Sequence, residues 1–199
     1  MESVMESKAA LRKKLLTRRR ALTREQWLSE SEKIQAQAAS LPLLRDVARI
    51  HCYVSMEHDR EARTLELLET LVLDGKAVYM PYIEDGCMKA AVYHPGQQFR
   101  ISASAPATPE PLVLSQEECF DVVFVPLAGF DRQGGRIGFG KGWYDRFFSH
   151  LSAEGVCPVK IGLAFSFQEV PSVPCDLWDE RLDMVVTELE IINCQQNSR

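Results

Sequence analysis

The stretch FDVVFVPLAGF, residues 120–130, is nearly all apolar and runs directly into a glycine-rich segment. A short apolar run of this kind is typical of a β-strand that is buried on both faces. Strands buried on both faces belong to parallel sheets whose two sides are covered by helices. This stretch therefore indicates an α/β fold in which it forms a buried strand.

The segments on either side alternate between strand patterns and helix patterns. The first forty residues contain neither glycine nor proline and are predicted to be helical, with a second helix beginning near Arg24 at the capping box Thr23-Arg24-Glu25-Gln26. An amphipathic helix is expected at 62–76, ending at Gly75, and another is expected to begin at Trp143. Further strands are expected at 48–56, 77–83, 88–94, 159–167 and 183–192.

This alternation predicts a mostly parallel central sheet flanked by helices. The length of 199 residues favours a single domain, 1–199, and a content of 46% hydrophobic and 26% charged residues is that of a globular protein. Residues 95–118 contain four prolines and are expected to form an irregular crossing segment rather than a linker, because apolar strand material resumes after them.

The charge of the chain is unevenly distributed. A net charge of -5 argues against general affinity for nucleic acid. Eight lysines and arginines nevertheless fall between Lys8 and Arg24, with no acidic residue before Arg24 in that segment. A basic segment of this kind can bind RNA, lipid headgroups or a polyphosphate, or it can simply be the solvated face of a helix.

The six cysteines are widely spaced, without a CxxC pair or a histidine at zinc-finger spacing. This pattern predicts reduced thiols rather than disulfides or a metal cluster, and it favours a cytoplasmic location. The beginning of the chain lacks the apolar core of a signal peptide, and no run reaches the roughly 18 apolar residues that a membrane helix needs. We therefore expect no membrane partner.

The segment GGRIGFGKGWYDRFF, residues 134–148, comes after the buried strand and leads into a helix. Glycines at 138, 140 and 142 permit positive φ angles and close approach of a ligand to the main chain. Successive N–H groups before a helix form an anion site, to which Arg136 and Lys141 add full charges. The segment predicts a phosphate chain as ligand, and a tight structural turn is the alternative. It matches neither GxxxxGK[ST] nor GxGxxG.

Charged residues elsewhere can complete such a site. Asp145 can hold Mg²⁺ together with phosphate oxygens, with Asp183 as a second contact. The alternatives are a helix-start aspartate for Asp145 and a solvent-exposed turn residue for Asp183. Lys8 and Arg12 lie four residues apart, so they point the same way on a helix. We expect Lys13, Lys14 and Arg18–20 to be solvated.

Four motifs occur together in the order found in one enzyme family: KAALR, SM…EART, VPLAGFD and GGRIGFGKGWYDRFF. With them the chain resembles the 5-formyltetrahydrofolate cyclo-ligases, also called methenyltetrahydrofolate synthetases, from about Lys8 to Glu188. The resemblance implies a cyclo-ligase fold of the NagB/RpiA/CoA-transferase-like type, with a core at about 8–188 and flexible ends. It also implies conversion of 5-formyltetrahydrofolate, ATP and Mg²⁺ to 5,10-methenyltetrahydrofolate, ADP and phosphate.

The resemblance also assigns roles to individual residues. The implied ATP site consists of Lys8, Arg12, Arg136, Gly138, Gly140, Lys141, Gly142, Trp143 and Tyr144, with Lys141 and Arg136 catalytic. The implied folate site consists of Val54, Met56, Glu61, Phe139, Gly140, Lys141, Gly142 and Trp143, with Asp59 as the alternative to Glu61. Asp145 and Asp183 would carry Mg²⁺. The implied partners are these small molecules alone, bound by a monomer.

Trp143 departs from the family pattern, which often has Tyr or Phe at that position.

Two other functions remain open on the residues alone. The glycine-rich segment could serve another ATP-dependent ligase or kinase, or it could hold RNA beside the basic helix in a non-catalytic module. A folate-binding relative without turnover is a third alternative.

Overall fold

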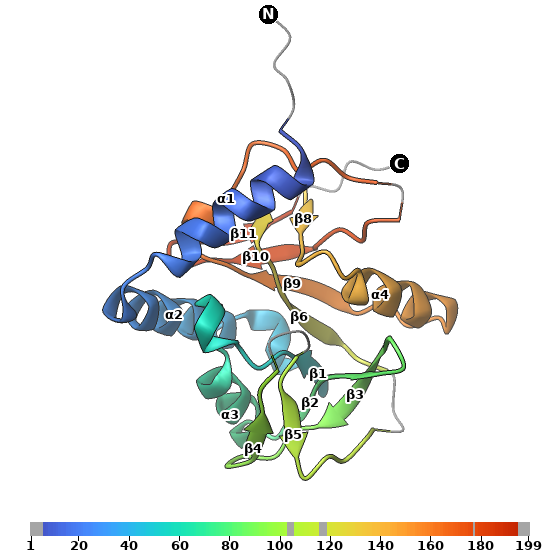
Figure 1. Cartoon of the computed structure of the whole chain (residues 1–199). Helices are drawn as coiled ribbons and strands as arrows, with labels where there is room; N and C mark the ends of the chain where they lie inside the picture. Colours follow the sequence, from blue (N-terminus) through green and yellow to red (C-terminus); the bar gives the residue numbers. More distant parts are fainter. Residues whose placement is uncertain (1–5, 103–105, 116–118, 177, 195–199) are drawn as a thin grey trace, which may run out of the picture.

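The computed structural model describes residues 6–102, 106–115, 119–176 and 178–194, and Figure 1 shows a central sheet with helices packed against it. The expected flexible ends include residues 1–5 and 195–199, which lie outside the described residues. The helices are α1 (Lys8–Arg20), α2 (Arg24–Ala39), α3 (Leu65–Leu73) and α4 (Trp143–Ala153), with short 3₁₀ helices η1 (Pro42–Arg45), η2 (Glu57–Asp59) and η3 (Ser166–Gln168). None of the helices in the described part of the chain is long and apolar enough to cross a membrane.

Seven strands form the central sheet, in the order β11-β10-β9-β6-β1-β2-β3. Their bounds are β1 (Arg49–Cys52), β2 (Ala77–Glu84), β3 (Cys87–Val92), β6 (Val122–Pro126), β9 (Val159–Leu163), β10 (Met184–Val186) and β11 (Ile191–Asn193). The five inner strands are parallel, and the edge strands β3 and β11 run antiparallel to their neighbours. This confirms the predicted α/β fold with a mostly parallel sheet.

Strand β6 shows why the apolar run at 120–130 has no polar face. Phe124 packs into a cluster with Trp27 and Ile34 of α2 and with the leucines of α3. Its neighbours Val123 and Val125 point the other way, into a cluster with the aromatic residues of α4. Side chains alternate along a strand, so a strand covered on both sides must be apolar throughout. Helices α2 and α3 thus cover one face of the sheet, and α4 covers the other.

The predicted capping box begins α2 as expected: the Thr23 hydroxyl accepts a hydrogen bond from the Gln26 N–H, and the Gln26 side chain accepts one from the Thr23 N–H. Helix α3 ends two residues before Gly75, whose φ of 77° allows the chain to turn out of the helix. Local sequence signals therefore set these two boundaries.

Two expectations about strands need correction. The segment 95–118 was expected to be irregular, but β4 (Gln98–Arg100) and β5 (Thr108–Glu110) form a small antiparallel ribbon within it. Phe99 of β4 stacks on Tyr93, which fixes the ribbon against the sheet. A two-stranded ribbon at an edge tolerates proline because its outer N–H groups need no partner. Residues 103–105 and 116–118 of this segment lie outside the described residues.

The strand expected at 183–192 is instead a hairpin of two strands, β10 and β11. The hydroxyl of Thr187 accepts hydrogen bonds from the N–H groups of Leu189 and Glu190. A hydroxyl that binds the main chain two and three residues later stabilises a turn. Because the residues on both sides of this turn are apolar, the sequence predicted one continuous strand.

Helix α1 lies away from the main sheet, over a second small hairpin formed by β7 (Gly129–Phe130) and β8 (Arg136–Ile137). Leu11 and Leu15 of α1 pack against Ala128 and Ile137 there. This places the basic helix beside the chain that continues from β6, and next to the glycine-rich segment.

His51 of β1 is fully buried between the rings of Phe120 and Phe147, at centroid distances of 5.4 and 5.1 Å. Its two ring nitrogens have no hydrogen-bond partner in the described part of the chain. Burial lowers the pKa of this histidine from 6.5 to about 3. Between these values the unfolded chain binds a proton that the folded chain does not, so His51 destabilises the fold increasingly as the pH falls below 6.5.

We therefore expect His51→Leu to reduce the acid sensitivity of the fold. Between pH 7 and pH 5 the parent protein should lose about 2 kcal/mol more free energy of unfolding than the variant, because one unmatched proton is worth about 1.4 kcal/mol per pH unit. Urea denaturation at the two pH values measures this difference. His94→Leu, which removes an exposed histidine, is the matched variant for the loss of a histidine at the surface. Equal dependence in parent and His51→Leu would contradict the expectation.

Candidate active site

A cavity of about 650 Å³ lies at the carboxyl ends of β1 and β6, where Tyr53 follows β1 and Pro126 ends β6. The chain leaves β1 toward β2 on one side, whereas β6 lies on the other side, and open α/β sheets bind ligands at such a switch point. The cavity has the size of a small-molecule site. Its lining includes these predicted residues: Lys8, Arg12, Val54, Met56, Glu61, Arg136, Gly138, Phe139, Gly140, Lys141, Gly142, Trp143, Tyr144 and Asp145.

The β7–β8 hairpin is held in place by the buried carboxylate of Asp131. One oxygen accepts hydrogen bonds from the N–H groups of Gln133 and Gly135, and the other accepts one from Val173. A side chain on Gly135 would collide with this carboxylate. Asp131 thus fixes the strand from which the glycine-rich loop begins.

The glycine-rich loop, residues 138–142, connects β8 to α4 with its main chain open. Gly140 and Gly142 have φ angles of 88° and 64°, which side chains disfavour, and Gly142 is the N-cap of α4. Within the described part of the chain, no group accepts a hydrogen bond from the amides of residues 139–144. Unpaired amides at the start of a helix form an anion site.

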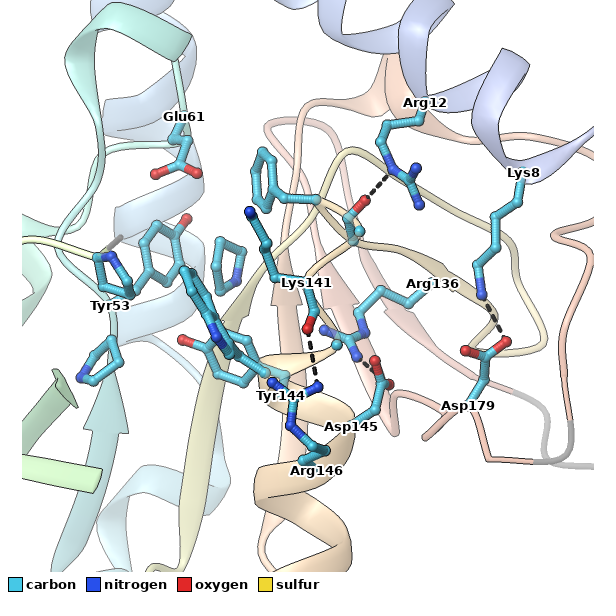
Figure 2. Close-up of a pocket in the computed structure, with 18 of the residues that line it drawn as sticks. Lys8, Arg12, Tyr53, Glu61, Arg136, Lys141, Tyr144, Asp145, Arg146 and Asp179 are labelled. Atoms are coloured by element: carbon cyan, nitrogen blue, oxygen red, sulfur yellow. Dashed lines mark hydrogen bonds and ion pairs between the residues drawn. The ribbon is translucent and has the colours of Figure 1, made fainter. Parts of the chain in front are cut away.

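Five cations line the cavity around this loop, namely Lys8, Arg12, Arg136, Lys141 and Arg146, and Figure 2 shows Lys8 and Arg12 coming from α1. Lys8 Nζ lies 2.6 Å from the Asp179 carboxylate, and Arg12 Nε donates to the Gly138 carbonyl at 2.7 Å. Arg136 is 8% exposed and pairs with Asp145 at 2.5 Å. The remaining cations of the lining, Arg12, Lys141 and Arg146, have no ion-pair partner among the described residues, so their charges are left for a ligand.

The two aspartates predicted to bind Mg²⁺ are not brought together. Asp145 lines the cavity, but Asp183 does not, and its carboxylate accepts a hydrogen bond from the Lys160 N–H at 2.8 Å. The described residues contain no cluster of three His, Cys, Asp or Glu side chains suited to a metal. The role of Asp183 stays a prediction.

Glu61 lies at the other side of the cavity in the view of Figure 2 and is 2% exposed. Its Oε2 accepts a hydrogen bond from the Met56 N–H at 2.8 Å, whereas Oε1 has no partner in the described part of the chain. Burial raises the pKa of Glu61 to about 7. Asp59, the alternative residue, already pairs with Arg20 at 2.7 Å. Glu61 therefore has the acceptor that is still available.

One expectation about α1 is wrong, because Arg19 is only 1% exposed and not solvated. Its Nε donates to the Asp59 carbonyl at 2.7 Å, and its Nη1 donates to the Leu127 carbonyl at 3.1 Å. Arg19 follows Leu15 by four residues, on the buried face of the helix. The four-residue spacing of Leu11, Leu15 and Arg19 indicates that Arg19 lies on the buried face of α1. Because arginine side chains are usually exposed, all three residues of the run Arg18–20 were expected to be solvated. Lys13 and Lys14 are exposed as expected.

Several residues of the cavity lining were not predicted, notably Tyr53, Trp178 and Asp179. Tyr53 follows β1 in the structure, at the carboxyl end of the strand where ligands bind, but the strand expected at 48–56 was too long and placed Tyr53 inside it. Trp178 and Asp179 lie in an irregular segment, and no local pattern places that segment beside α1.

Comparisons with known proteins agree with these motifs. The model of the 5-formyltetrahydrofolate cyclo-ligase family matches residues 4–188. A 5-formyltetrahydrofolate cyclo-ligase of Escherichia coli (strain K12) is 33% identical over 181 residues, covering 87% of this chain and 96% of the relative. The Saccharomyces cerevisiae protein of the same name is 29% identical over 203 residues, covering 92% and 95%. The NMR structure of Aquifex aeolicus 5,10-methenyltetrahydrofolate synthetase is similar with a TM-score of 0.79 and 30% identity, covering 96% and 95%.

The conformation of the loop predicts different effects of two alanine substitutions. Gly140→Ala should lower the free energy of unfolding by about 1 kcal/mol, because its φ is positive and the new Cβ would lie 3.3 Å from Arg12 Nη1. Gly138→Ala is the matched control with ordinary φ and open space, and it should change stability by less than about 0.5 kcal/mol. Urea denaturation measures both, and equal effects would show that the loop conformation is not the one described.

Proposed function

The chain belongs to the 5-formyltetrahydrofolate cyclo-ligase family and is an enzyme of that class, and we propose that it uses ATP and Mg²⁺ to convert 5-formyltetrahydrofolate to 5,10-methenyltetrahydrofolate. The observation that carries this proposal is one cavity with two complementary sides. One side has open amides and cations suited to phosphates, and the other has a buried carboxylate oxygen that has no donor in the part of the chain that the structure describes.

The phosphate side would bind ATP through the loop amides and the surrounding cations. The positive charge comes from Lys8, Arg12, Arg136 and Lys141. The wall of the ATP site consists of Gly138, Gly140, Gly142, Trp143 and Tyr144. Lys8 and Arg136 are already neutralised by Asp179 and Asp145. Lys141 belongs to the loop itself and has no ion-pair partner among the described residues, so we place it against the γ-phosphoryl group as the principal catalytic residue, assisted by Arg136.

The folate side would bind the pterin ring, which carries an amino group and ring N–H groups. Glu61 Oε1 lacks a donor among the described residues, and an unpaired carboxylate oxygen in a buried position is unfavourable until a ligand supplies a donor. Val54, Met56, Phe139 and Trp143 provide apolar or aromatic surface for the ring in the same cavity. Gly140, Lys141 and Gly142 would face both substrates.

Mg²⁺ fits this cavity as an ion held jointly by protein and nucleotide. It usually takes one or two carboxylates together with phosphate oxygens, and Asp145 is a partly exposed carboxylate beside the loop. Bound there, the ion would neutralise part of the phosphate charge. The absence of a three-residue cluster among the described residues is compatible with a site completed by phosphates.

The reaction would proceed in two steps. The formyl oxygen attacks the γ-phosphorus of ATP, so the bond to the β–γ bridging oxygen breaks and ADP leaves. N10 then attacks the activated formyl carbon, loses its proton, and the C–O bond breaks to release phosphate and leave the methenyl bridge. Such a reaction needs positioning and charge neutralisation rather than a nucleophilic side chain. The loop amides and Lys141 hold the phosphates, and Glu61 orients the ring.

The first test is turnover itself, followed by the near-ultraviolet absorbance of the methenyl product and by release of ADP. Lys141→Ala should lower kcat/KM about 100-fold or more, since it removes a charge directed at the transferred group. Lys13→Ala removes an exposed lysine of α1 and should retain parental activity. Normal turnover by Lys141→Ala would contradict the phosphate site, and absence of both products with the parent protein would contradict the proposed reaction.

A magnesium titration tests the role of Asp145. Asp145→Asn should raise the Mg²⁺ concentration needed for half-maximal rate about tenfold, because it removes the anionic oxygen that the ion prefers. Asp183→Asn tests the second predicted contact, which does not line the cavity, and a parental titration curve in this variant would remove Asp183 from the predicted metal site. Asp145→Asn also removes the ion pair between Asp145 and Arg136. The affinity of this variant for ATP in the absence of Mg²⁺ shows whether loss of that ion pair alone changes nucleotide binding. An unchanged titration in Asp145→Asn would exclude this residue from the metal site.

A further inference from the structure

Arg19 is the most deeply buried cation of α1, and the proposed reaction assigns it no role. Its guanidinium joins three segments around the cavity. Nε binds the carbonyl of Asp59 at the end of η2, Nη1 binds the carbonyl of Leu127 just after β6, and Cζ lies 5.4 Å from the centre of the Phe139 ring in the loop. Nη2 is buried without a hydrogen-bond partner in the described part of the chain.

A guanidinium at this depth requires a compensating negative charge, since burying an unpaired ion is very unfavourable. Two carboxylates act on Arg19, those of Glu61 and Asp59. The Asp59 carboxylate is already paired with Arg20. Glu61 lies two residues after Asp59, whose carbonyl Arg19 binds, and it has no ion-pair partner of its own among the described residues. Each of the two residues also has one buried polar atom without a partner in the described part of the chain.

The groups that act on Glu61 come from four elements. Arg19 in α1 and the Met56 N–H favour its ionised form, whereas Asp59 in η2 opposes it. Tyr53 after β1 and Tyr144 of α4 also face it, and burial raises the pKa of both phenols, so both are neutral near pH 7. Arg19 is the cation in this set. Without its charge, burial alone would drive Glu61 to the protonated form.

We propose that Arg19 is a positioning residue that keeps Glu61 ionised and oriented to accept hydrogen bonds from the pterin ring of the substrate. This inference rests on the proposed function, because it assumes that Glu61 binds the ring. Arg19 itself does not line the cavity, so it acts through Glu61 rather than by touching the substrate.

The effect of the Arg19 charge on Glu61 predicts the direction in which KM changes with pH. Glu61 binds ring donors when it is ionised, so the KM for 5-formyltetrahydrofolate should rise as the pH falls through about 7, the pKa to which burial raises Glu61. Removal of the Arg19 charge favours protonation further. The pH at which KM begins to rise should therefore move upward when Arg19 becomes neutral.

The experiment compares Arg19→Gln, which keeps donor groups without the charge, with Arg19→Lys, which keeps the charge. KM and kcat for the folate are measured from pH 6 to pH 9. Arg19→Gln should shift the KM midpoint upward by about one pH unit, equivalent to about a tenfold higher KM below the midpoint, with kcat nearly unchanged. Arg19→Lys should stay within about 0.3 pH units of the parent. A variant with a purely structural defect would lose kcat or stability without moving the midpoint.

A second readout is independent of turnover. Carbon-13 NMR of labelled glutamate carboxyls follows the Glu61 titration without any substrate, and Glu61→Gln identifies the resonance. A shift of this titration in Arg19→Gln supports the coupling even if the proposed reaction is wrong. An unshifted resonance overturns the inference. A shifted resonance with an unshifted KM overturns it as well, because the charge of Glu61 would then not serve the substrate. If Arg19→Gln does not fold, Arg19→Met is measured in its place.

Discussion

The parallel pairing of β1 with β6 is the constraint on which the rest of this structure depends. The chain leaves these adjacent strands in different directions, so their carboxyl ends open onto a shared space. The segment after β1 brings Tyr53, Met56 and Glu61 to that space, and the segment after β6 brings the glycine-rich loop. Two segments about eighty residues apart in the sequence thus form one cavity.

Within that cavity the protein pairs two of its five lining cations with carboxylates and leaves other groups without partners among the described residues. Asp179 and Asp145 neutralise Lys8 and Arg136, and the Gly138 carbonyl accepts from Arg12. The loop amides, the Lys141 ammonium and one oxygen of Glu61 remain without partners among the described residues. These groups are complementary to an anion at one side and to N–H donors at the other. The ion pairs with Asp179 and Asp145 hold Lys8 and Arg136 in place and reduce the repulsion among the cations that line the cavity.

The sequence predicts the features of this fold that depend on short-range patterns. The apolar run around Phe124, the capping box at Thr23 and the glycines at 138–142 each correspond to an observed feature, because each has a local physical cause. The ribbon at Phe99 depends on stacking with Tyr93, which lies outside the segment 95–118, and the turn at Thr187 depends on a side chain binding its own main chain. Arg19 was missed because its two carbonyl partners, at Asp59 and Leu127, are brought to it only by the tertiary fold.

Helix α1 carries cations that relate to both sides of the cavity. Lys8 lies near its first turn, where it lines the cavity, and Arg19 lies near its last turn, beside the segment that carries Glu61. At about 1.5 Å per residue, the helix separates these two positions by roughly 16 Å. Because an α-helix is stiff, α1 fixes the distance between the phosphate side of the cavity at Lys8 and the folate side near Glu61. Natural insertions within α1 would change that spacing at once, whereas insertions in the β2–β3 turn would leave it intact.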